Sequence, residues 1–546
     1  MPDRQLLVKL FLFFLIAFSI RFYFGWHYYD ISPDGVYYAQ IGEHIYQNHS
    51  YGIMNVPGYP AIIQPPVYPS LIAFSRILLP KEFAGKFVNI VLGTFLVILI
   101  FFIAKSLYGE KVANLSAFIA AIHPFLIFFS IQWLTETTFL FWATLSMLSV
   151  RQFQLQRKGY FAIGAVIAAG LAYLTRVEGI LILGLVWALV AYYAIPKRNF
   201  HLIAGTSILV AAIIIGYAGW VSAKVDRWVW IPKLYFTQSH KIIFQLKAQS
   251  DPQFLEENPR LRTRKVFAAI DSTNSQLLSF HLFHLLIKGV HLEIPQSSPI
   301  NRKQVFKNMI TYNFRSLLWV IYRRYAIPVS LIPFLLIGFL YGFYKKKKFF
   351  KEHLFVLLWF APFGYFLLSH VEKRFLLGWA FLSVLWIALG TAVLYRWIRK
   401  HFPFQKILMV GMYGGIGIAL IPFFLQLIEK IDTENQLYKV THQLRKVIPQ
   451  GAKVVSSRPI HAFYNDWVFY RLPWIDNPQQ LYEYFKHTTS EYLLLEAPRD
   501  TLYNQHYALL FQKGLPSQYV QKNAIIEIPD FTTRWFQLNR TKNAVP

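Results

Sequence analysis

Carboxylates and arginines stand in four of the breaks between the apolar runs of this sequence. They are Asp34; Glu136; Arg176 and Glu178; and His370, Glu372 and Arg374. A carboxylate can take a proton from a hydroxyl group, and a guanidinium can bind two oxygens of a phosphate. These residues can form one site only if the chain brings all four breaks to the same side of the molecule.

Asp34 lies in the stretch Ser32–Tyr38, directly after the first apolar run. Ser32 or Asp34 can cap a short helix that Pro33 or Gly35 opens, because both side chains accept hydrogen bonds from the free N–H groups of a helix start. The apolar stripe of this helix is formed by Val36, Tyr37, Ile41 and Ile45. These residues alone are consistent with either a capping role or a chemical role for Asp34.

A proline-rich segment, Gln64-Pro65-Pro66-Val67-Tyr68-Pro69, follows this helix. Proline fixes its own φ and restricts the residue before it, so the segment is predicted to be extended. The chain is then expected to return to the apolar runs.

The composition indicates a polytopic membrane protein. Of the 546 residues, 55% are apolar and 18% aromatic, and only 15% are charged. A helix needs about 20 mostly apolar residues to cross a bilayer, and runs near this length recur from Leu6 to about Ile428. The first run lacks a small-residue cleavage site and is predicted to be a retained span rather than a signal peptide. The absence of cysteine excludes disulfides and thiolate metal sites.

Eleven transmembrane helices are predicted from these runs. They lie at about 6–24, 84–104, 112–131, 135–150, 160–174, 179–195, 201–222, 317–344, 353–369, 376–395 and 407–428. With the N-terminus inside, the inner connections contain 18 basic residues and three acids, and the short outer connections are poorer in Lys and Arg. The positive-inside rule and anionic head groups therefore explain the formal charge of +28 better than nucleic-acid binding does.

This topology brings all four breaks to the outer face of the membrane. The long connections 25–83 and 223–316 lie on that face too. The second of them is basic, and its pattern predicts amphipathic helices that lie along the membrane surface.

The chain changes character from Ile431, where the apolar runs shorten to strand length. Strands are predicted at 452–456 and 491–495, and helices near 433–447 and 477–487. The sequence thus predicts two domains. Residues 1–430 form a membrane domain, and residues 431–546 form a small extracytoplasmic α/β domain.

The acid in the first outer loop, the Tyr-rich helix after it and the Pro-Pro-x-Tyr-Pro segment resemble the GT-C superfamily of integral-membrane glycosyltransferases. Within it, the pattern is most similar to the group of protein O-mannosyltransferases and lipid A aminoarabinose transferases. Further matches along residues 1–400 are His123-Pro124 with Leu134-Thr135-Glu136, then Gly170–Gly179, then His370–Phe375. Two positions depart from the pattern. Gly35 stands where many relatives have a second acid, and Gln64 stands where the aminoarabinose transferases often have Lys.

The resemblance implies transfer of a sugar, with inversion, from a polyprenyl-phosphate donor to an acceptor hydroxyl on the outer face. Asp34 would be the base that takes the acceptor proton, and Glu136 would have a catalytic or acceptor-orienting role. Arg176 and Arg374 would bind the donor phosphate, because a guanidinium stays charged near lipid. Positioning roles would fall to Tyr37, Glu178, His370 and Glu372.

Structural roles are open for the same residues. Arg176 with Glu178, and Arg374 with Glu372, can be ion pairs that close outer turns. Glu136 can cap a helix, and His370 can be a hydrogen-bonded interface residue. No metal and no cofactor are predicted, because the apparent pair Glu43 and His44 is adjacent on a helix and points to different faces.

Two other functions compete with glycosyl transfer. A transporter or flippase for a lipid-linked glycan would also carry polar residues, but it should place charged groups or broken helices near the bilayer midplane. A non-catalytic assembly or binding protein on the same scaffold would not need Asp34. Transfer is the preferred interpretation, with lipid A, another cell-envelope glycan or a protein as the acceptor. The expected setting is a bacterial inner membrane, with the site facing the periplasm.

Overall fold

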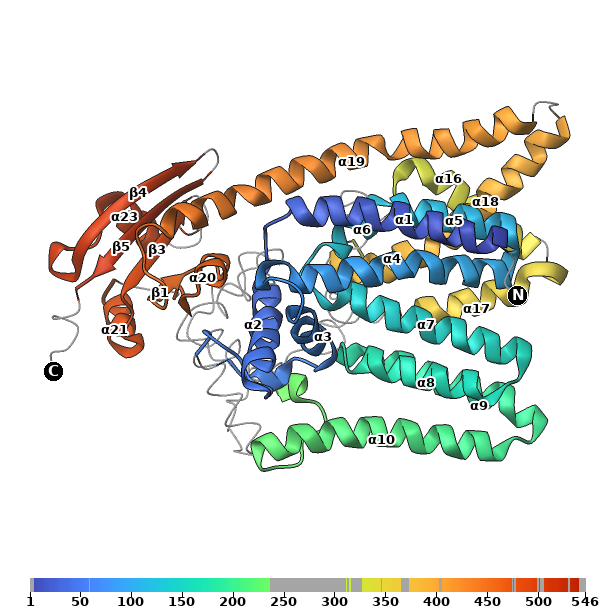
Figure 1. Ribbon diagram of the computed structural model, residues 1–546, viewed down its shortest axis with the longest axis horizontal. Helices are drawn as coiled ribbons and strands as arrows, with labels where there is room; N and C mark the ends of the chain where they lie inside the picture. Colours follow the sequence, from blue (N-terminus) through green and yellow to red (C-terminus); the bar gives the residue numbers. More distant parts are fainter. Residues whose placement is uncertain are drawn as a thin grey trace.

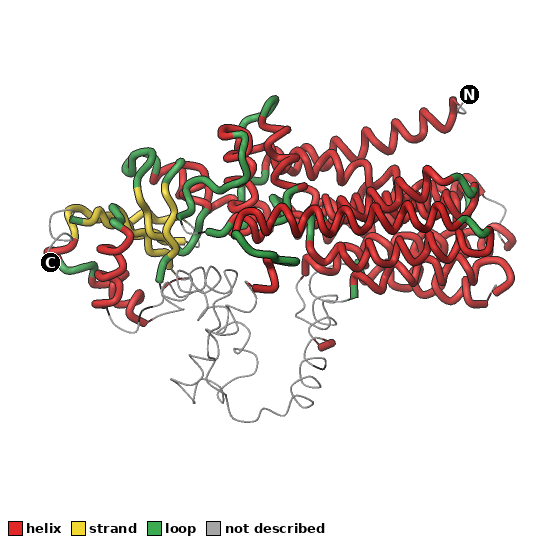
Figure 2. The backbone as a smooth tube through the Cα atoms, turned by 90° about the horizontal axis from the view of Figure 1, so that it is seen from below, coloured by secondary structure: helices red, strands yellow, loops and turns green. Residues whose placement is uncertain are grey.

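The computed structural model describes most of the chain. The described residues are 4–57, 59–235, 311, 314, 315, 327–344, 346–364, 373–401, 405–473, 475, 478–497, 500, 505–528 and 531–539. Figure 1 shows a bundle of helices that run side by side, with an α/β domain beyond one end. Figure 2 shows the same division, with the strands gathered at the end opposite the N-terminus.

The bundle is built from two groups of apolar helices. Its first part comprises α1 (Arg4–His27), α4 (Lys81–Tyr108), α5 (Glu110–Ile122), α6 (Pro124–Ser130), α7 (Thr135–Gln156), α8 (Gly159–Tyr173), α9 (Ile180–Ala194) and α10 (Phe200–Val225). Its second part comprises α16 (Ile332–Tyr344), α17 (Lys346–Phe363), α18 (Leu377–His401) and α19 (Gln405–Leu444). The shorter helices α2 (Pro33–Asn48) and α3 (Val67–Arg76) lie across the end of the bundle nearest the α/β domain (Figure 1).

Short 3-10 turns η2 (Val177–Gly179) and η6 (Lys373–Leu376) precede α9 and α18. Each predicted span overlaps a helix, with α5 and α6 together at the third. Within the described ranges, six helices are long and apolar enough to cross a membrane, or seven if the α5–α6 pair is one span. The polytopic helical fold is confirmed, and the number of eleven spans stays a prediction. The α5–α6 pair bends by 58° at Pro124, which has no N–H to continue the helix.

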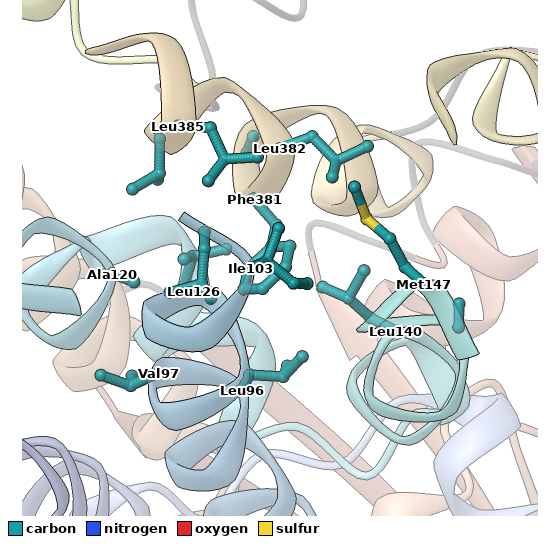
Figure 3. Close-up of a cluster of buried hydrophobic side chains, with 14 of the residues drawn as sticks. Leu96, Val97, Ile103, Ala120, Leu126, Leu140, Met147, Phe381, Leu382 and Leu385 are labelled. Atoms are coloured by element: carbon teal, nitrogen blue, oxygen red, sulfur yellow. The ribbon is translucent and has the colours of Figure 1, made fainter. Parts of the chain in front are cut away.

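Helix α18 runs through the middle of the bundle. In its apolar window 89% of the residues are buried, compared with 11% in α1 at the edge. Figure 3 shows apolar side chains of α18 among those of α4, α5, α6 and α7; the labelled residues are Leu96, Val97, Ile103, Ala120, Leu126, Leu140, Met147, Phe381, Leu382 and Leu385. Such packing stabilises helix contacts in lipid through van der Waals attraction. Because η6 leads directly into α18, this core also fixes the position of Arg374.

Two buried cations hold the end of the bundle that carries α2. Arg21 on α1 is 1% exposed and donates to two backbone carbonyls in the last turn of α5, each at 3.0 Å. Lys86 on α4 is 2% exposed and donates to the carbonyls of Gly25 at 3.1 Å and Tyr28 at 2.5 Å, where α1 ends. The last carbonyls of a helix lack intrahelical partners and carry partial negative charge. The cations satisfy them, and the chain leaves α1 from a fixed point.

The C-terminal domain contains a five-stranded sheet of order β2-β1-β3-β5-β4. Its elements are β1 (Lys453–Ser456), α20 (Ile460–Asn465), β2 (Val468–Arg471), α21 (Pro478–Thr488), β3 (Tyr492–Ala497), α23 (Gln505–Lys513), β4 (Val520–Ile528) and β5 (Phe531–Leu538). Strand β1 pairs in parallel with β2 and β3, and β5 pairs antiparallel with β3 and β4. The predicted strands at 452–456 and 491–495 are confirmed, whereas the sequence patterns did not predict the β4–β5 hairpin.

Helix α19 joins the two parts of the molecule (Figure 1). It has 40 residues, so it is about 60 Å long, roughly twice the hydrocarbon thickness of a bilayer. The predicted span 407–428 is therefore only its first half, and the predicted helix near 433–447 is largely its continuation. The predicted domain boundary between residues 430 and 431 falls inside this unbroken helix.

The second half of α19, together with α20, holds the loop between α1 and α2. The side chain of Asn435 accepts a hydrogen bond from the Tyr29 N–H at 2.8 Å, and the Tyr464 hydroxyl donates to the Tyr29 carbonyl at 2.5 Å. The Tyr28 hydroxyl donates to Glu434 at 2.8 Å. The C-terminal domain therefore helps to position the residues that lead into α2.

Asp30 lies in this loop, and the pKa of its carboxyl is raised from 3.8 to about 6. Burial is the main cause of the increase, and the negative charge of Glu434 is the second. The positive charges of Arg458 and Lys430 oppose it. The folded state thus binds the proton more tightly than the unfolded state. The contribution of this proton to the free energy of unfolding is fully present below about pH 4. It is lost, by up to about 3 kcal/mol, as the pH rises through about 6. We expect the apparent Tm of the native protein to fall across this window and that of Asp30→Asn to fall much less, measured by thermal unfolding in detergent. Exposed Asp226→Asn is the control, and a native-like fall in Asp30→Asn would contradict the assignment.

Candidate active site

The first turn of α2 presents Asp34. The Ser32 hydroxyl oxygen accepts a hydrogen bond from the Gly35 N–H at 3.1 Å, and Pro33 occupies the first helical position. The predicted helix start is confirmed, with Ser32 as the cap, so the carboxylate of Asp34 is available for another partner. A Cβ at Gly35 would lie 2.8 Å from the backbone oxygen of Trp133, so only glycine lets α2 approach the segment before α7 this closely.

Arg374 links Asp34 to Glu136. Its Nη1 lies 2.7 Å from Oδ2 of Asp34, and its Nε lies 3.7 Å from Oε1 of Glu136. Asp34 comes from α2, Glu136 from the first turn of α7, and Arg374 from η6 before α18. Three segments far apart in the sequence therefore converge, as the predicted common face requires.

The line of charges continues from Glu136 to Lys233. Nη1 of Arg176 lies 2.6 Å from Oε1 of Glu136, and its Nε lies 3.5 Å from Oε2 of Glu178. Nζ of Lys233 lies 2.7 Å from Oε1 of Glu178. Three carboxylates alternate with three cations along this line, which we call the ion-paired line, so its formal charges cancel.

Burial is graded along the ion-paired line. The side chain of Glu136 is 6% exposed, that of Arg374 is 25% exposed and that of Asp34 is 43% exposed. A buried carboxylate between two guanidiniums is held in place by both, whereas an exposed carboxylate can exchange partners with solvent. Asp34 at one end and Lys233 at the other, which is 45% exposed, are thus the parts of the line that a water-soluble group can reach.

Phe375 lies beside both guanidiniums. The ring centroid is 5.8 Å from Cζ of Arg176 and 5.4 Å from Cζ of Arg374. Distances within about 6 Å allow cation–π attraction, which adds to the ion pairs in orienting the two arginines.

An apolar pocket opens next to the arginines, between α7, α17 and the start of α18. Its charged end is formed by Glu136, Arg176, Glu178 and Arg374, and its apolar walls by Phe139, Leu140, Pro362, Phe363, Phe375, Leu377 and Gly378. A Cβ at Gly378 would lie 2.4 Å from the ring of Phe363, so glycine lets α17 and α18 approach each other here. The pocket thus places two guanidiniums and two carboxylates beside an apolar wall.

Tyr37 and Tyr38 have different surroundings. The Tyr37 ring stacks on Tyr59, with the centroids 4.1 Å apart, and Gln64 donates to the Tyr59 hydroxyl at 2.6 Å. The Tyr38 hydroxyl bonds to Thr135, and burial first, then the charge of Asp34, raises the pKa of Tyr38 above its usual value. Tyr38 thus lies among the groups of the ion-paired line, and the positioning role of Tyr37 stays a prediction.

The proline-rich segment differs from its predicted form. Gln64 is extended, but α3 already begins at Val67, and Pro69 lies in its first turn. Proline is tolerated there because the first N–H groups of a helix have no intrahelical partner. The segment therefore enters a helix at once and carries Tyr68 into the protein interior.

The structure brings together five predicted site residues: Asp34, Glu136, Arg176, Glu178 and Arg374. His370 and Glu372 lie outside the described residues, so the predicted pairing of Glu372 with Arg374 has no structural counterpart to report. In the described ranges, no three His, Cys, Asp or Glu side chains are grouped as metal ligands. Sequence reasoning missed Lys233, Tyr38 and Phe375. Phe375 directly follows Arg374, but no pattern in residues 223–316 singles out Lys233.

Comparisons with known proteins agree with this architecture. Residues 63–220 match the sequence model of the family described as dolichyl-phosphate-mannose-protein mannosyltransferase. This segment contains Glu136, Arg176 and Glu178, whereas Asp34 and Arg374 lie outside it. A comparison with curated proteins found no match.

Solved structures resemble the whole chain. The oligosaccharyltransferase of Archaeoglobus fulgidus in complex with Zn and sulfate superposes with a TM-score of 0.52 at 15% identity, covering 98% of this chain and 74% of that one. Its apo form gives a TM-score of 0.51 at 14% identity, covering 100% and 75%. ArnT from Cupriavidus metallidurans bound to undecaprenyl phosphate gives 0.49 at 14% identity, covering 100% of both chains. The chain has the GT-C fold of integral-membrane glycosyltransferases, and its residues 63–220 match the mannosyltransferase family.

Proposed function

We propose that the protein is an inverting glycosyltransferase that moves a sugar from a polyprenyl-phosphate donor to a hydroxyl group on the outer face of the membrane. The observation that carries the proposal is the placement of Arg176 and Arg374 at the charged end of an apolar pocket, with Asp34 bound to Arg374. The family match over residues 63–220 and the GT-C fold support the same reaction class.

The donor fits the pocket by its two chemical parts. The isoprenoid chain would lie along Phe139, Phe363 and Leu377, and the phosphate would reach the guanidiniums of Arg176 and Arg374. A guanidinium has a planar fork of N–H donors that matches phosphate oxygens. The phosphate would compete with Asp34 for Arg374, so donor binding would release the carboxylate.

The released carboxylate would then serve as the base. The acceptor oxygen attacks the anomeric carbon of the sugar and forms the new glycosidic bond, while the bond from that carbon to the phosphate oxygen breaks. The polyprenyl phosphate leaves with the electron pair, stabilised by the two arginines, and the acceptor proton passes to Asp34. Attack on the face opposite the leaving group inverts the configuration.

The positions of the charges distinguish this proposal from transport. Glu136 lies in the first turn of α7, Arg176 directly precedes η2, and Arg374 lies in η6 before α18. All are at helix ends, whereas a transporter places such groups near the bilayer midplane. This arrangement favours transfer over transport.

The sidedness of the site is part of the proposal. Helix α2, whose first turn carries Asp34, lies at the end of the bundle nearest the C-terminal domain (Figure 1), and the connections rich in Lys and Arg lie between the other helix ends. The site and residues 431–546 would face the periplasm of a bacterial inner membrane. The sugar, hexose or pentose, and the acceptor, lipid A, another envelope glycan or a protein, are the finer parts of the proposal.

Arg374→Gln tests the donor site. Purified protein is given a panel of polyprenyl-phosphate hexoses and pentoses, and transfer is measured as released polyprenyl phosphate and as glycosylated acceptor. Losing a charged hydrogen bond to phosphate costs about 1.5–3 kcal/mol, so kcat/KM for the donor should fall roughly 10- to 150-fold. Arg374→Lys should recover part of this loss, because the charge remains. The control is Arg399→Gln, an exposed position on α18, the helix that follows Arg374. Unchanged transfer by Arg374→Gln would count against the proposal.

A further inference from the structure

A second cavity, of about 410 Å³, lies between α2, α3, the start of α4 and the C-terminal domain. On α2 its wall is formed by Gln40, Glu43 and Gln47, which recur every three or four residues and so share one helix face. At about 100° per residue, this face is turned roughly 180° from Asp34 and Tyr38. The cavity is therefore separate from the ion-paired line and its apolar pocket.

The charged groups of this cavity neutralise one another. Arg76 holds Glu43 through two nitrogen–oxygen contacts of 2.6 and 3.2 Å. Lys81 donates to Asp466 of the C-terminal domain. Two cations thus balance two carboxylates, so the cavity has no net charge with which to select an ion.

Two amides in the wall have unused hydrogen-bonding groups. Gln40 is only 6% exposed, and neither its side chain nor that of Asn55 makes a hydrogen bond within the described ranges of the chain. An amide offers two N–H donors and a carbonyl acceptor. Since both residues line the cavity, these groups are presented to its occupant.

Aromatic rings form an apolar part of the wall. Trp133 and Phe463 pack edge to face, with ring centroids 5.5 Å apart, and both line the cavity. Nε1 of Trp133 is buried and has no hydrogen-bond partner among the described residues. The wall thus combines apolar surface with donors and acceptors of hydrogen bonds.

We propose that this cavity binds a neutral carbohydrate unit. Each sugar hydroxyl is both a donor and an acceptor, which matches the amides of Gln40, Gln47, Asn55 and Gln450. The C–H faces of a sugar suit the rings of Trp133 and Phe463. The volume lies in the range of small-molecule sites, roughly 300–1,000 Å³. The balanced charges favour a neutral sugar over a phosphate, a uronic acid or an amine.

Binding tests this site apart from transfer. The full chain is placed in lipid nanodiscs, which avoids sugar-containing detergents. Saturation-transfer NMR then measures methyl mannoside, methyl galactoside and methyl N-acetylglucosaminide, with glucuronic acid and glucosamine as charged probes. At least one neutral glycoside should bind more tightly than both charged probes. Asp34→Asn should bind it equally, so failure of the proposed reaction does not affect this result.

Variants of the wall locate the binding. Gln40→Met keeps the side-chain volume and removes its hydrogen bonds, and it should weaken binding about 2- to 10-fold for each bond lost. Gln450→Ala alters an exposed residue at the mouth of the cavity, so it tests the site even if Gln40→Met fails to fold. Gln443→Ala, at an exposed position on α19, is the matched control for Gln450→Ala. Absence of neutral-glycoside binding, preference for a charged probe, or native affinity in both Gln40→Met and Gln450→Ala would each overturn the proposal.

Discussion

Asp34→Asn is expected to lower kcat for glycosyl transfer by a factor of about 100 to 10,000, the usual contribution of a general base. The amide of asparagine can still accept a hydrogen bond from Arg374, so the fold should be preserved. It competes with the donor phosphate for Arg374 less strongly than a carboxylate does. The KM for the donor should therefore stay constant or fall while kcat collapses, which distinguishes lost base catalysis from lost binding.

The measurement is steady-state transfer at several donor concentrations, with thermal unfolding to verify folding. Exposed Asp432→Asn on α19 makes the same chemical change away from the ion-paired line and should be neutral. Native turnover by Asp34→Asn would remove Asp34 as the base. A rise in donor KM without a fall in kcat would instead give Asp34 a role in binding.

Glu136→Gln is expected to have the largest effect on stability. Glu136 is 6% exposed and lies between Arg176 at 2.6 Å and Arg374 at 3.7 Å. Removing one partner of a buried ion pair typically costs about 3–5 kcal/mol, because the remaining charge is left uncompensated. The two guanidiniums would then repel each other with no negative charge between them, so the apparent Tm in detergent should fall clearly.

A bound anion should offset this loss. Inorganic phosphate or a polyprenyl phosphate between the arginines would replace the missing negative charge, and the variant should regain more Tm from either compound than the native protein gains. Glu110→Gln, in the exposed pair with Lys9 at 2.9 Å, is the matched control, because an exposed pair contributes only about 0–1 kcal/mol. Equal Tm values for Glu136→Gln and Glu110→Gln would contradict the bridging role of Glu136.

The sequence predicts this fold well wherever short-range interactions determine the position of a helix. Apolar runs near 20 residues long locate the helices, because a bilayer leaves few alternatives. Ser32 and Pro33 locate the start of α2, because cap and first-turn preferences are local. The loop charges bring Asp34, Glu136 and Arg374 to one face, and the structure places them in contact.

Which charged residues form ion pairs is determined by tertiary contacts, which cannot be read from neighbouring residues in the sequence. Sequence neighbours suggested Glu178 for Arg176 and Glu372 for Arg374. In the structure, Glu136 from another helix is the nearer partner of Arg176, and Asp34 is the nearest described partner of Arg374. Which helix ends meet depends on packing around α18, and no local pattern encodes it.

Local periodicity also left helix rotation and helix length open. Tyr37 and Tyr38 are adjacent on α2, so the choice between them depends on how the whole helix is rotated. Helix α19 continues past the apolar run because residues 430–444 contain no Gly or Pro to stop it. An apolar run marks where a helix lies in lipid, and it does not mark where that helix ends.

Helix α19 runs without interruption from Gln405 to Leu444, with Pro422 inside it, and so connects the C-terminal domain directly to the helix bundle. A tilt of about 5° over a rod of roughly 60 Å displaces its far end by about 5 Å. Helix α19 also carries Glu434 and Asn435, which accept hydrogen bonds from the loop that precedes α2. A force on the C-terminal domain, such as contact with a bulky substrate, would therefore also act on the loop before α2 and on the helix turn that presents Asp34.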